Sequence, residues 1–208
     1  MNKSVLILLG EGVELLEMSG FVDVMAWASF SPKIEINVVS ASIHPTIQSA
    51  FGDLKIQAST QLCDLNLDRF DALAIPGGME WAGFFNDAYS EEFQSTINYF
   101  HKRNKPIAAV CVASLSLAHA GVLKDQNAAI FHSKTGKHKA KLESYGAIFQ
   151  DAPIVKSNNI LTSTGPGTSV EIAFELLEML CGSDIVSETR ALMRIPHPTQ
   201  NWYKPQVP

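Results

Sequence analysis

Short apolar runs that stop at glycine or proline constrain the fold of this chain more than any other feature. The runs at residues 5–9 and 71–75 stop at Gly10 and Pro76. Runs of this length suit strands that are covered on both faces. Because helical segments separate them, they predict an α/β fold with a mainly parallel sheet and helices on both faces. Further strand candidates lie at residues 34–39, 106–110, 128–131 and 160–163.

The segments between these runs carry helical patterns. The clearest, residues 90–103, begins with acidic residues, carries an apolar stripe at i, i+4 and i+7, and ends with basic residues. Residues 44–59 predict a hairpin or an excursion at a sheet edge. We expect one domain over residues 1–192 and a Pro-rich extension without its own core over residues 193–208. Other predicted helices span residues 14–29, 112–120 and 170–181.

Charge and cysteine content narrow the functional classes. The net charge of −5 and the scattered basic residues argue against a nucleic-acid-binding surface, and the lysines of residues 134–141 are interpreted as a solvated face. No stretch reaches the roughly 18 apolar residues of a membrane-spanning helix. The run at residues 5–9 lacks the cleavage site of a signal peptide. Three widely spaced cysteines make no disulfide framework, so we expect a cytoplasmic protein without nucleic-acid or membrane partners.

Cys111 is the strongest candidate for a reactive side chain. It lies between the predicted strand 106–110 and the predicted helix 112–120, as a nucleophile elbow requires. Alanines two residues before and two residues after it leave room for a tight turn. The N-terminus of the following helix is expected to lower the pKa of the thiol. A buried structural cysteine is the alternative interpretation.

Other candidates are predicted to reach the same carboxyl edge of the sheet. Gly77 and Gly78 follow a strand, and their N–H groups are candidates for an oxyanion hole, although Pro-Gly-Gly is also common in turns. Glu17 lies in an apolar helix, where a carboxyl group tends to stay protonated and can act as a general acid. A partly exposed helix acid is its alternative. His132 is a candidate base or orienting group, or an ordinary surface or core histidine.

Together these segments resemble the ThiJ/PfpI superfamily. The matching motifs run in order from about residue 4 to about residue 182. The resemblance implies a flavodoxin-like three-layer α/β sandwich, usually a homodimer, in which Cys111 is the reactive cysteine and Glu17 is its hydrogen-bonding acid. It also implies that Gly77 and Gly78 are oxyanion donors and that His132 is the histidine near the thiol in the Parkinson-linked deglycase branch. The motifs are Gly12, Glu17, residues 22–25, Ile75-Pro-Gly-Gly78, Ile107-Ala-Ala-Val-Cys111 and Leu161-Thr-Ser-Thr-Gly-Pro-Gly-Thr168.

The chain departs from several branches of that superfamily. Val112 follows the cysteine where the PfpI peptidase and heat-shock chaperone branches carry histidine, which argues against a protease. Val112 is grouped instead with the two glycines as an oxyanion- or substrate-binding residue. The deglycase branch has Cys-Ala-Gly-Pro where this chain has Cys-Val-Ala-Ser. His197-Pro-Thr199 is not the His-x-Glu pair of class I glutamine amidotransferases, which argues against a glutaminase.

The resemblance favours a cysteine-dependent enzyme that needs no metal or organic cofactor. Its small-molecule substrate is expected to be methylglyoxal or an adduct of it, converted to a 2-hydroxy acid as in glyoxalase III and deglycase members. Leu15-Leu-Glu-Met-Ser-Gly20 is also similar to the acid-containing helix of the isocyanide hydratase branch, which carries aspartate and a following Gly-Pro. A non-enzymatic alternative is a redox-sensing stress protein or chaperone in which Cys111 is oxidised to a sulfinate.

Overall fold

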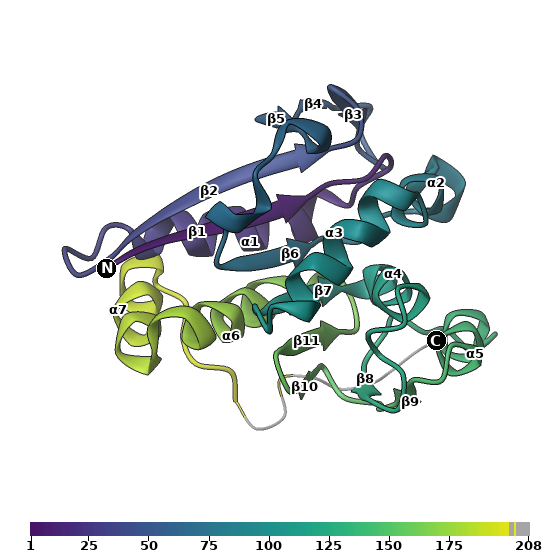
Figure 1. The fold of residues 1–208 in the computed structure, drawn as a ribbon. Helices are drawn as coiled ribbons and strands as arrows, with labels where there is room; N and C mark the ends of the chain where they lie inside the picture. The colour runs from purple at the N-terminus through teal and green to yellow at the C-terminus, as the bar shows by residue number, and fades with distance from the viewer. Residues whose placement is uncertain (200–201, 203–208) are drawn as a thin grey trace.

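A seven-stranded sheet forms the centre of the protein (Figure 1). The computed structural model describes residues 1–199 and 202. The strand order is β10-β11-β7-β6-β1-β2-β5, and all neighbouring strands are parallel except the edge pair β10 and β11. The strands are β1 (Asn2–Leu8), β2 (Glu35–Ser42), β5 (Thr60–Gln61), β6 (Ala72–Ile75), β7 (Ile107–Val110), β10 (Ile154–Ser157) and β11 (Ile160–Ser163).

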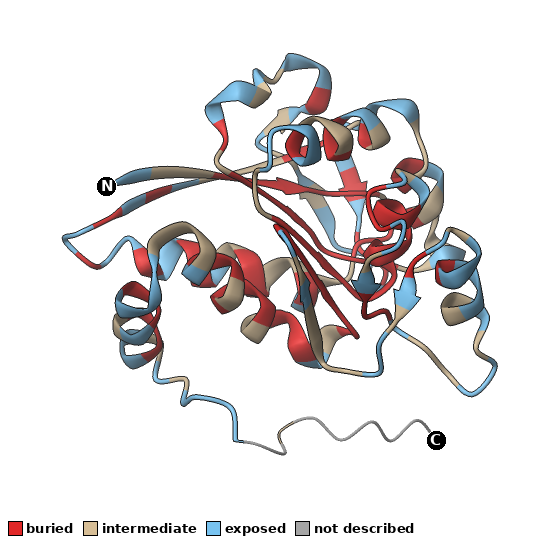
Figure 2. Ribbon diagram, turned by 60° about the horizontal axis from the view of Figure 1, so that its bottom comes forward, coloured by how far each residue is buried: buried red, intermediate tan, exposed pale blue. Residues whose placement is uncertain are grey.

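The interior strands form where the sequence has continuous apolar runs. Every residue of β6, β7 and β11 is buried, as expected of parallel strands covered on both faces. Figure 2 shows these buried residues along the central strands. The register pairs Val110 with Ser163, and Ala109 with Ile75, so the three strands end at a common edge. The residues after that edge, at 76–78, 111 and 164, therefore lie close together.

Helices cover both faces of the sheet, so the expected three-layer α/β sandwich is confirmed. On one face α1 (Leu15–Ala28), α6 (Ser169–Cys181) and α7 (Ser183–Met193) pack against one another. On the other face α3 (Glu91–Lys102) and α4 (Ser114–His119) pack together (Figure 1). Within residues 1–199 and 202, the structure contains no helix with the length and apolar character needed to cross a membrane.

Close packing against α6 fixes the position of α1. A Cβ added to Gly20 would lie 2.9 Å from the Cβ of Ser169 on α6, so the two helices approach each other more closely than larger side chains allow. Helix α1 begins with Glu14 as its N-cap, whose side chain accepts a hydrogen bond from the Glu17 N–H at 2.8 Å. These contacts position Glu17, which lies in the first turn of α1.

The structure confirms the predicted hairpin and corrects two predicted elements. The hairpin of residues 44–59 is present as β3 (Thr46–Gln48) and β4 (Lys55–Gln57). The helix after Cys111 starts as a 3₁₀ turn over Cys111–Ala113, and α4 follows it. The strand predicted at residues 128–131 is wrong beyond its first residue. Only β8 (Asn127–Ala128) forms, because it pairs with β9 (Ile148–Phe149) outside the main sheet.

The C-terminal part contains a helix that the sequence patterns did not predict. Helix α7 ends at Met193, next to the predicted domain boundary. Residues 195–199 form no regular element. The remainder of the predicted extension, apart from Trp202, lies outside the described residues.

Candidate active site

Cys111 occupies a strained turn at the end of β7. Its φ angle is 59°, in the left-handed region that residues with a side chain seldom adopt. The chain passes there from the strand into the helical turn, with Ala109 and Ala113 on either side. This strand–turn–helix arrangement is that of a nucleophile elbow. Cys111 is only 6% exposed, so the turn holds the thiol below the surface.

The carboxyl group of Glu17 lies beside this elbow. Glu17 is fully buried, and its Oε2 accepts a hydrogen bond from the Gly77 backbone N–H at 2.7 Å. A Cβ added to Gly77 would lie 2.7 Å from Glu17 Oε2 and 3.2 Å from the Cβ of Cys111. Gly77 therefore fills the space between the acid and the cysteine, where no side chain fits. The structure brings Glu17, Gly77 and Cys111 together as one group.

Burial determines the protonation state of Glu17. Desolvation raises the pKa of its carboxyl from 4.5 to about 8, although the Gly77 N–H and the Cys111 thiol act to lower it. The Oε1 atom of Glu17 is buried and has no hydrogen-bond partner among the described residues. Glu17 is therefore largely protonated at neutral pH and has a proton to donate at the elbow.

Burial also raises the pKa of the Cys111 thiol well above its ordinary value, and the negative charge of Glu17 raises it further. The Val112 N–H acts in the opposite direction by hydrogen bonding to the thiol. The expectation of a lowered thiol pKa is therefore wrong, because desolvation of the buried thiol is the largest contribution and raises the pKa. Glu17 and Cys111 form a coupled pair, in which ionisation of one group opposes ionisation of the other.

The predicted oxyanion donors differ in their availability. The Gly77 N–H is engaged by the Glu17 carboxyl, which needs a donor in its buried position. The Gly78 N–H has no hydrogen-bond partner among the described residues, and the Val112 N–H faces the thiol. A Cβ added to Gly78 would collide with the carbonyl oxygen of Gly12, so close packing fixes this glycine. Gly77 thus positions the acid, the Val112 N–H is bonded to the thiol, and the Gly78 N–H is free of partners among the described residues. Oxyanion binding by these N–H groups stays a prediction.

His132 lies on a loop and directs both ring nitrogens to other groups. Its Nδ1 is 3.1 Å from the carbonyl oxygen of Ile130, and its Nε2 is 3.6 Å from Oδ1 of Asp151. Its ring also packs edge-on against Phe149, with 5.0 Å between the centroids. None of these contacts joins His132 to Glu17 or Cys111. A role for His132 in proton transfer at the thiol therefore stays a prediction.

Glu14 belongs to the site although the sequence patterns did not single it out. Besides capping α1, its negative charge contributes to the raised pKa values of both Glu17 and Cys111. The sequence feature that could have identified Glu14 is its position, three residues before Glu17 at the start of an apolar helix. An acidic residue at such a position often acts as an N-cap.

The other two cysteines lie away from this pair of groups. Cys63 is exposed, Cys181 is half-buried, and all three cysteines are free thiols. Within residues 1–199 and 202, no group of three or more His, Cys, Asp or Glu side chains is placed to hold a metal ion. The elbow itself presents a thiol, a neutral acid and backbone N–H groups.

Comparisons with known proteins give one family over nearly the whole chain. The model of the DJ-1/PfpI family matches residues 3–179. Protein dj-1beta of Drosophila melanogaster is 28% identical over 188 residues, which cover 90% of this chain and 95% of that protein. The Parkinson disease protein 7 homolog of Danio rerio is 26% identical over 191 residues, covering 91% of this chain and 96% of that protein. The crystal structure of Drosophila melanogaster DJ-1beta superposes with a TM-score of 0.82 at 27% identity, covering 95% of this chain and all of that chain.

Proposed function

The chain belongs to the DJ-1/PfpI family, and we propose that it is a cysteine-dependent enzyme that acts on reactive carbonyls without a metal or organic cofactor. Its substrates are methylglyoxal or early adducts of it, and its products are 2-hydroxy acids, a glyoxalase III- or deglycase-like activity. The observation that carries this proposal is that a thiol on a strained elbow lies across Gly77 from an acid that stays protonated to about pH 8. Three free cysteines suit the reducing cytoplasm, where we place the enzyme.

The first step joins the Cys111 sulfur to the aldehyde carbon of methylglyoxal. The aldehyde oxygen takes the proton of the Glu17 carboxyl, and the thiol proton passes to Glu17, which ends the step neutral. The N–H groups of Gly78 and Val112 stabilise the negative charge that develops on the aldehyde oxygen. The product of this step is a hemithioacetal.

In the second step Glu17 first releases its proton to water. The carboxylate then removes the proton from the former aldehyde carbon and delivers it to the neighbouring carbon, while the hydroxyl proton passes from the first oxygen to the second. This transfer converts the hemithioacetal to a thioester. Water then cleaves the carbon–sulfur bond, which releases lactate and restores the thiol. The sum is methylglyoxal plus water to lactate plus a proton, and no external oxidant or reductant is consumed. We assign the transfers to Glu17 because the ring nitrogens of His132 face Ile130 and Asp151.

The test is conversion of methylglyoxal to lactate by Cys111→Ser and by the control Cys63→Ser. We expect Cys111→Ser to lose at least about a thousandfold in kcat/KM, since a residue that forms the covalent intermediate cannot be bypassed. Cys63 is exposed and outside the site, so Cys63→Ser should match the wild type. Full turnover by Cys111→Ser would refute the proposal.

The same pair of groups supports a second candidate, a redox-responsive protein. Peroxide would oxidise Cys111 to a sulfinate with release of water, and the protonated Glu17 carboxyl would donate a hydrogen bond to the product. Absence of turnover on any dicarbonyl, together with peroxide oxidation confined to Cys111 by mass spectrometry, would favour this function. Turnover of an isocyanide instead of a dicarbonyl would favour a hydratase.

Exposed apolar side chains of α1 support a homodimer as the working form. Leu16 is 51% exposed and Trp27 is 39% exposed, and at about 100° per residue they fall on the same side of the helix. Phe30, just beyond the helix, is 70% exposed. Apolar side chains gathered on one surface favour contact with another protein. We expect sedimentation equilibrium to give twice the mass of one chain, and a monomer mass at micromolar concentration would contradict this.

A further inference from the structure

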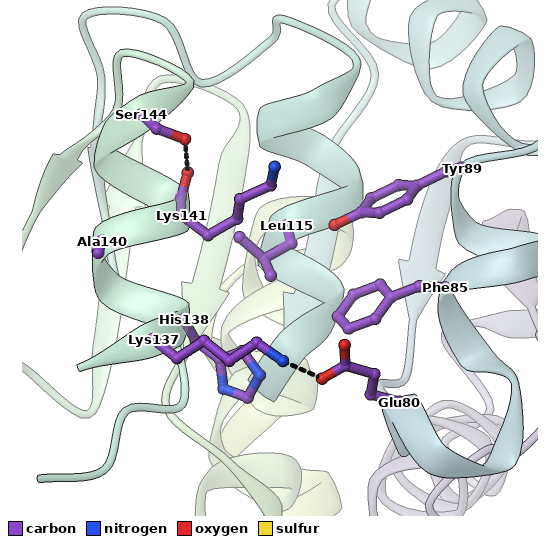
Figure 3. Close-up of a pocket in the computed structure, with 9 residues that line it drawn as sticks. All are labelled: Glu80, Phe85, Tyr89, Leu115, Lys137, His138, Ala140, Lys141 and Ser144. Atoms are coloured by element: carbon purple, nitrogen blue, oxygen red, sulfur yellow. Dashed lines mark hydrogen bonds and ion pairs between the residues drawn. The ribbon is translucent and has the colours of Figure 1, made fainter. Parts of the chain in front are cut away.

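A pocket of about 530 Å³ lies beside the elbow, between α2 (Phe84–Ala88), α4 and α5 (Lys137–Ser144). Leu115 on α4, four residues after Cys111, lies at its base (Figure 3). Phe85 and Tyr89 form one wall, and residues of α5 form the opposite wall. Cys111 is not one of the residues that line it, so this pocket is distinct from the thiol site. Its volume is in the range that holds small organic ligands.

The wall formed by α2 consists of aromatic rings that stack on one another. The rings of Phe85 and Tyr89 are stacked, with 5.1 Å between centroids and 16° between planes. Tyr89 stacks in turn on His119, at 4.5 Å. Burial raises the pKa of the Tyr89 phenol, so its hydroxyl group stays neutral and remains a hydrogen-bond donor. Between this wall and Leu115 there is an apolar space that suits a flat ring.

The wall formed by α5 carries positive charge, and only part of that charge is neutralised. The ammonium group of Lys137 forms an ion pair with Glu80 at 2.6 Å. The Lys141 ammonium lies 4.9 Å from the centroid of the Tyr145 ring, and no carboxylate of the described residues is within ion-pair distance of it. Figure 3 shows the Lys141 side chain extending over the pocket toward Leu115. The pocket therefore pairs an apolar base with one uncompensated cation.

We propose that this pocket binds small monocarboxylic acids with an aromatic body, with the ring between Phe85, Tyr89 and Leu115 and the carboxylate against Lys141. A monoanion fits better than a dianion, because a second negative charge would approach Glu80. Burial lowers the pKa of His138, so this residue contributes a neutral imidazole and no second full charge at neutral pH. The proposal goes beyond the carbonyl chemistry at Cys111 and does not depend on it.

The test is a ¹⁹F NMR titration at pH 7 with 3-(4-fluorophenyl)propionate and with its neutral counterpart 3-(4-fluorophenyl)propan-1-ol. We expect saturable binding of the acid and about tenfold weaker binding of the alcohol, because the alcohol carries no charge to pair with the Lys141 ammonium. The titration is repeated with Cys111→Ser, which should bind the acid as the wild type does. This repeat separates failure of the pocket from failure of the proposed enzyme.

Three variants in α5 locate the binding site. Lys141→Met keeps the length of the side chain and should reduce the affinity for the acid to that for the alcohol. Lys139→Met is the matched control, because the Lys139 ammonium lies over Phe149 instead, 4.7 Å from the ring centroid. Ala140→Trp places an indole ring in the pocket from an exposed position and should abolish binding of both compounds, with circular dichroism confirming the fold.

Several outcomes would overturn the proposed pocket. One is that the wild type shows no saturable binding, or binds acid and alcohol equally. Another is that Lys139→Met weakens binding as much as Lys141→Met. A third is that Cys111→Ser loses binding, which would place the acid at the thiol instead of in this pocket.

Discussion

The elbow and the pocket beside it share α4 but hold their polar groups in opposite ways. At the elbow, Glu17 is fully buried and Cys111 is 6% exposed, so desolvation keeps both groups protonated. In the pocket, the ion pair of Lys137 with Glu80 has side chains that are 64% and 56% exposed. Water screens that pair, and its two charges persist at little energetic cost.

This difference assigns the two regions different kinds of chemistry. A buried acid and thiol that share protons suit covalent chemistry, because small changes at the site move a proton between them. A screened, charged rim over an apolar base suits reversible binding, where charge selects the ligand and the apolar surface contributes affinity. The comparison predicts that substitutions at the elbow change stability strongly and with pH, whereas those in the pocket do not.

The largest effect is expected from Glu17→Gln on the pH dependence of stability. The folded chain keeps the Glu17 proton to about pH 8, whereas the unfolded chain releases it near pH 4.5. The stability that this proton provides is therefore complete below pH 4.5, declines as the pH rises, and is lost above pH 8. Relative to Glu17→Gln, the wild type should lose roughly 4 kcal/mol of unfolding free energy between pH 5 and pH 8. Urea denaturation at a series of pH values measures this change.

Glu80→Gln serves as the matched control for that experiment. The ion pair with Lys137 lowers the pKa of Glu80 below 4.5, so its titration falls outside the window from pH 5 to pH 8. The difference in unfolding free energy between the wild type and Glu80→Gln should stay constant across that pH window. A flat difference for Glu17→Gln as well would show that Glu17 is not held as a neutral acid.

A smaller effect on the unfolding free energy is expected from Gly77→Ala. The added Cβ would meet Glu17 Oε2 at 2.7 Å and the Val110 carbonyl oxygen at 2.9 Å, so the acid or the strand end must move. Overpacking of this kind costs about 1–3 kcal/mol of unfolding free energy. In the control Gly167→Ala, the added Cβ meets no atom within 4 Å, and its stability should stay within about 0.5 kcal/mol of the wild type. Equal stabilities of the two variants would contradict the close contact at Gly77.

The sequence was sufficient to predict the interior of the sheet and the position of the elbow. Strand β11 spans the predicted residues 160–163, because a short apolar run buried on both faces leaves few alternatives. The predicted strand at residues 128–131 was mostly wrong, because a similar run can also lie outside the main sheet, where Phe131 is 41% exposed. The sequence patterns also did not predict α7, whose apolar stripe is less pronounced than that of α3.

The contacts of the site could not be read from the sequence. Local patterns pointed to Cys111 and Glu17, but the hydrogen bond that engages the Gly77 N–H joins residues 60 positions apart. The direction of the Cys111 pKa depends on how completely other segments cover the thiol, which no local pattern records. The lysines of residues 134–141 were interpreted as a solvated face, yet two of them line a pocket because α2 and α5 meet beside α4.

The central claim, that Glu17 and Cys111 titrate as one coupled pair, is tested most directly by the pH dependence of Cys111 alkylation. Iodoacetamide labelling from pH 5 to pH 10, followed by peptide mass spectrometry, is compared for the wild type and Glu17→Gln. In the wild type we expect the midpoint to lie above that of a free thiol, because burial and the negative charge of Glu17 both raise the pKa of Cys111. In Glu17→Gln that charge is absent and only desolvation of the thiol remains, so the midpoint should move downward. Identical midpoints in the two proteins would contradict the coupling on which the proposed chemistry depends.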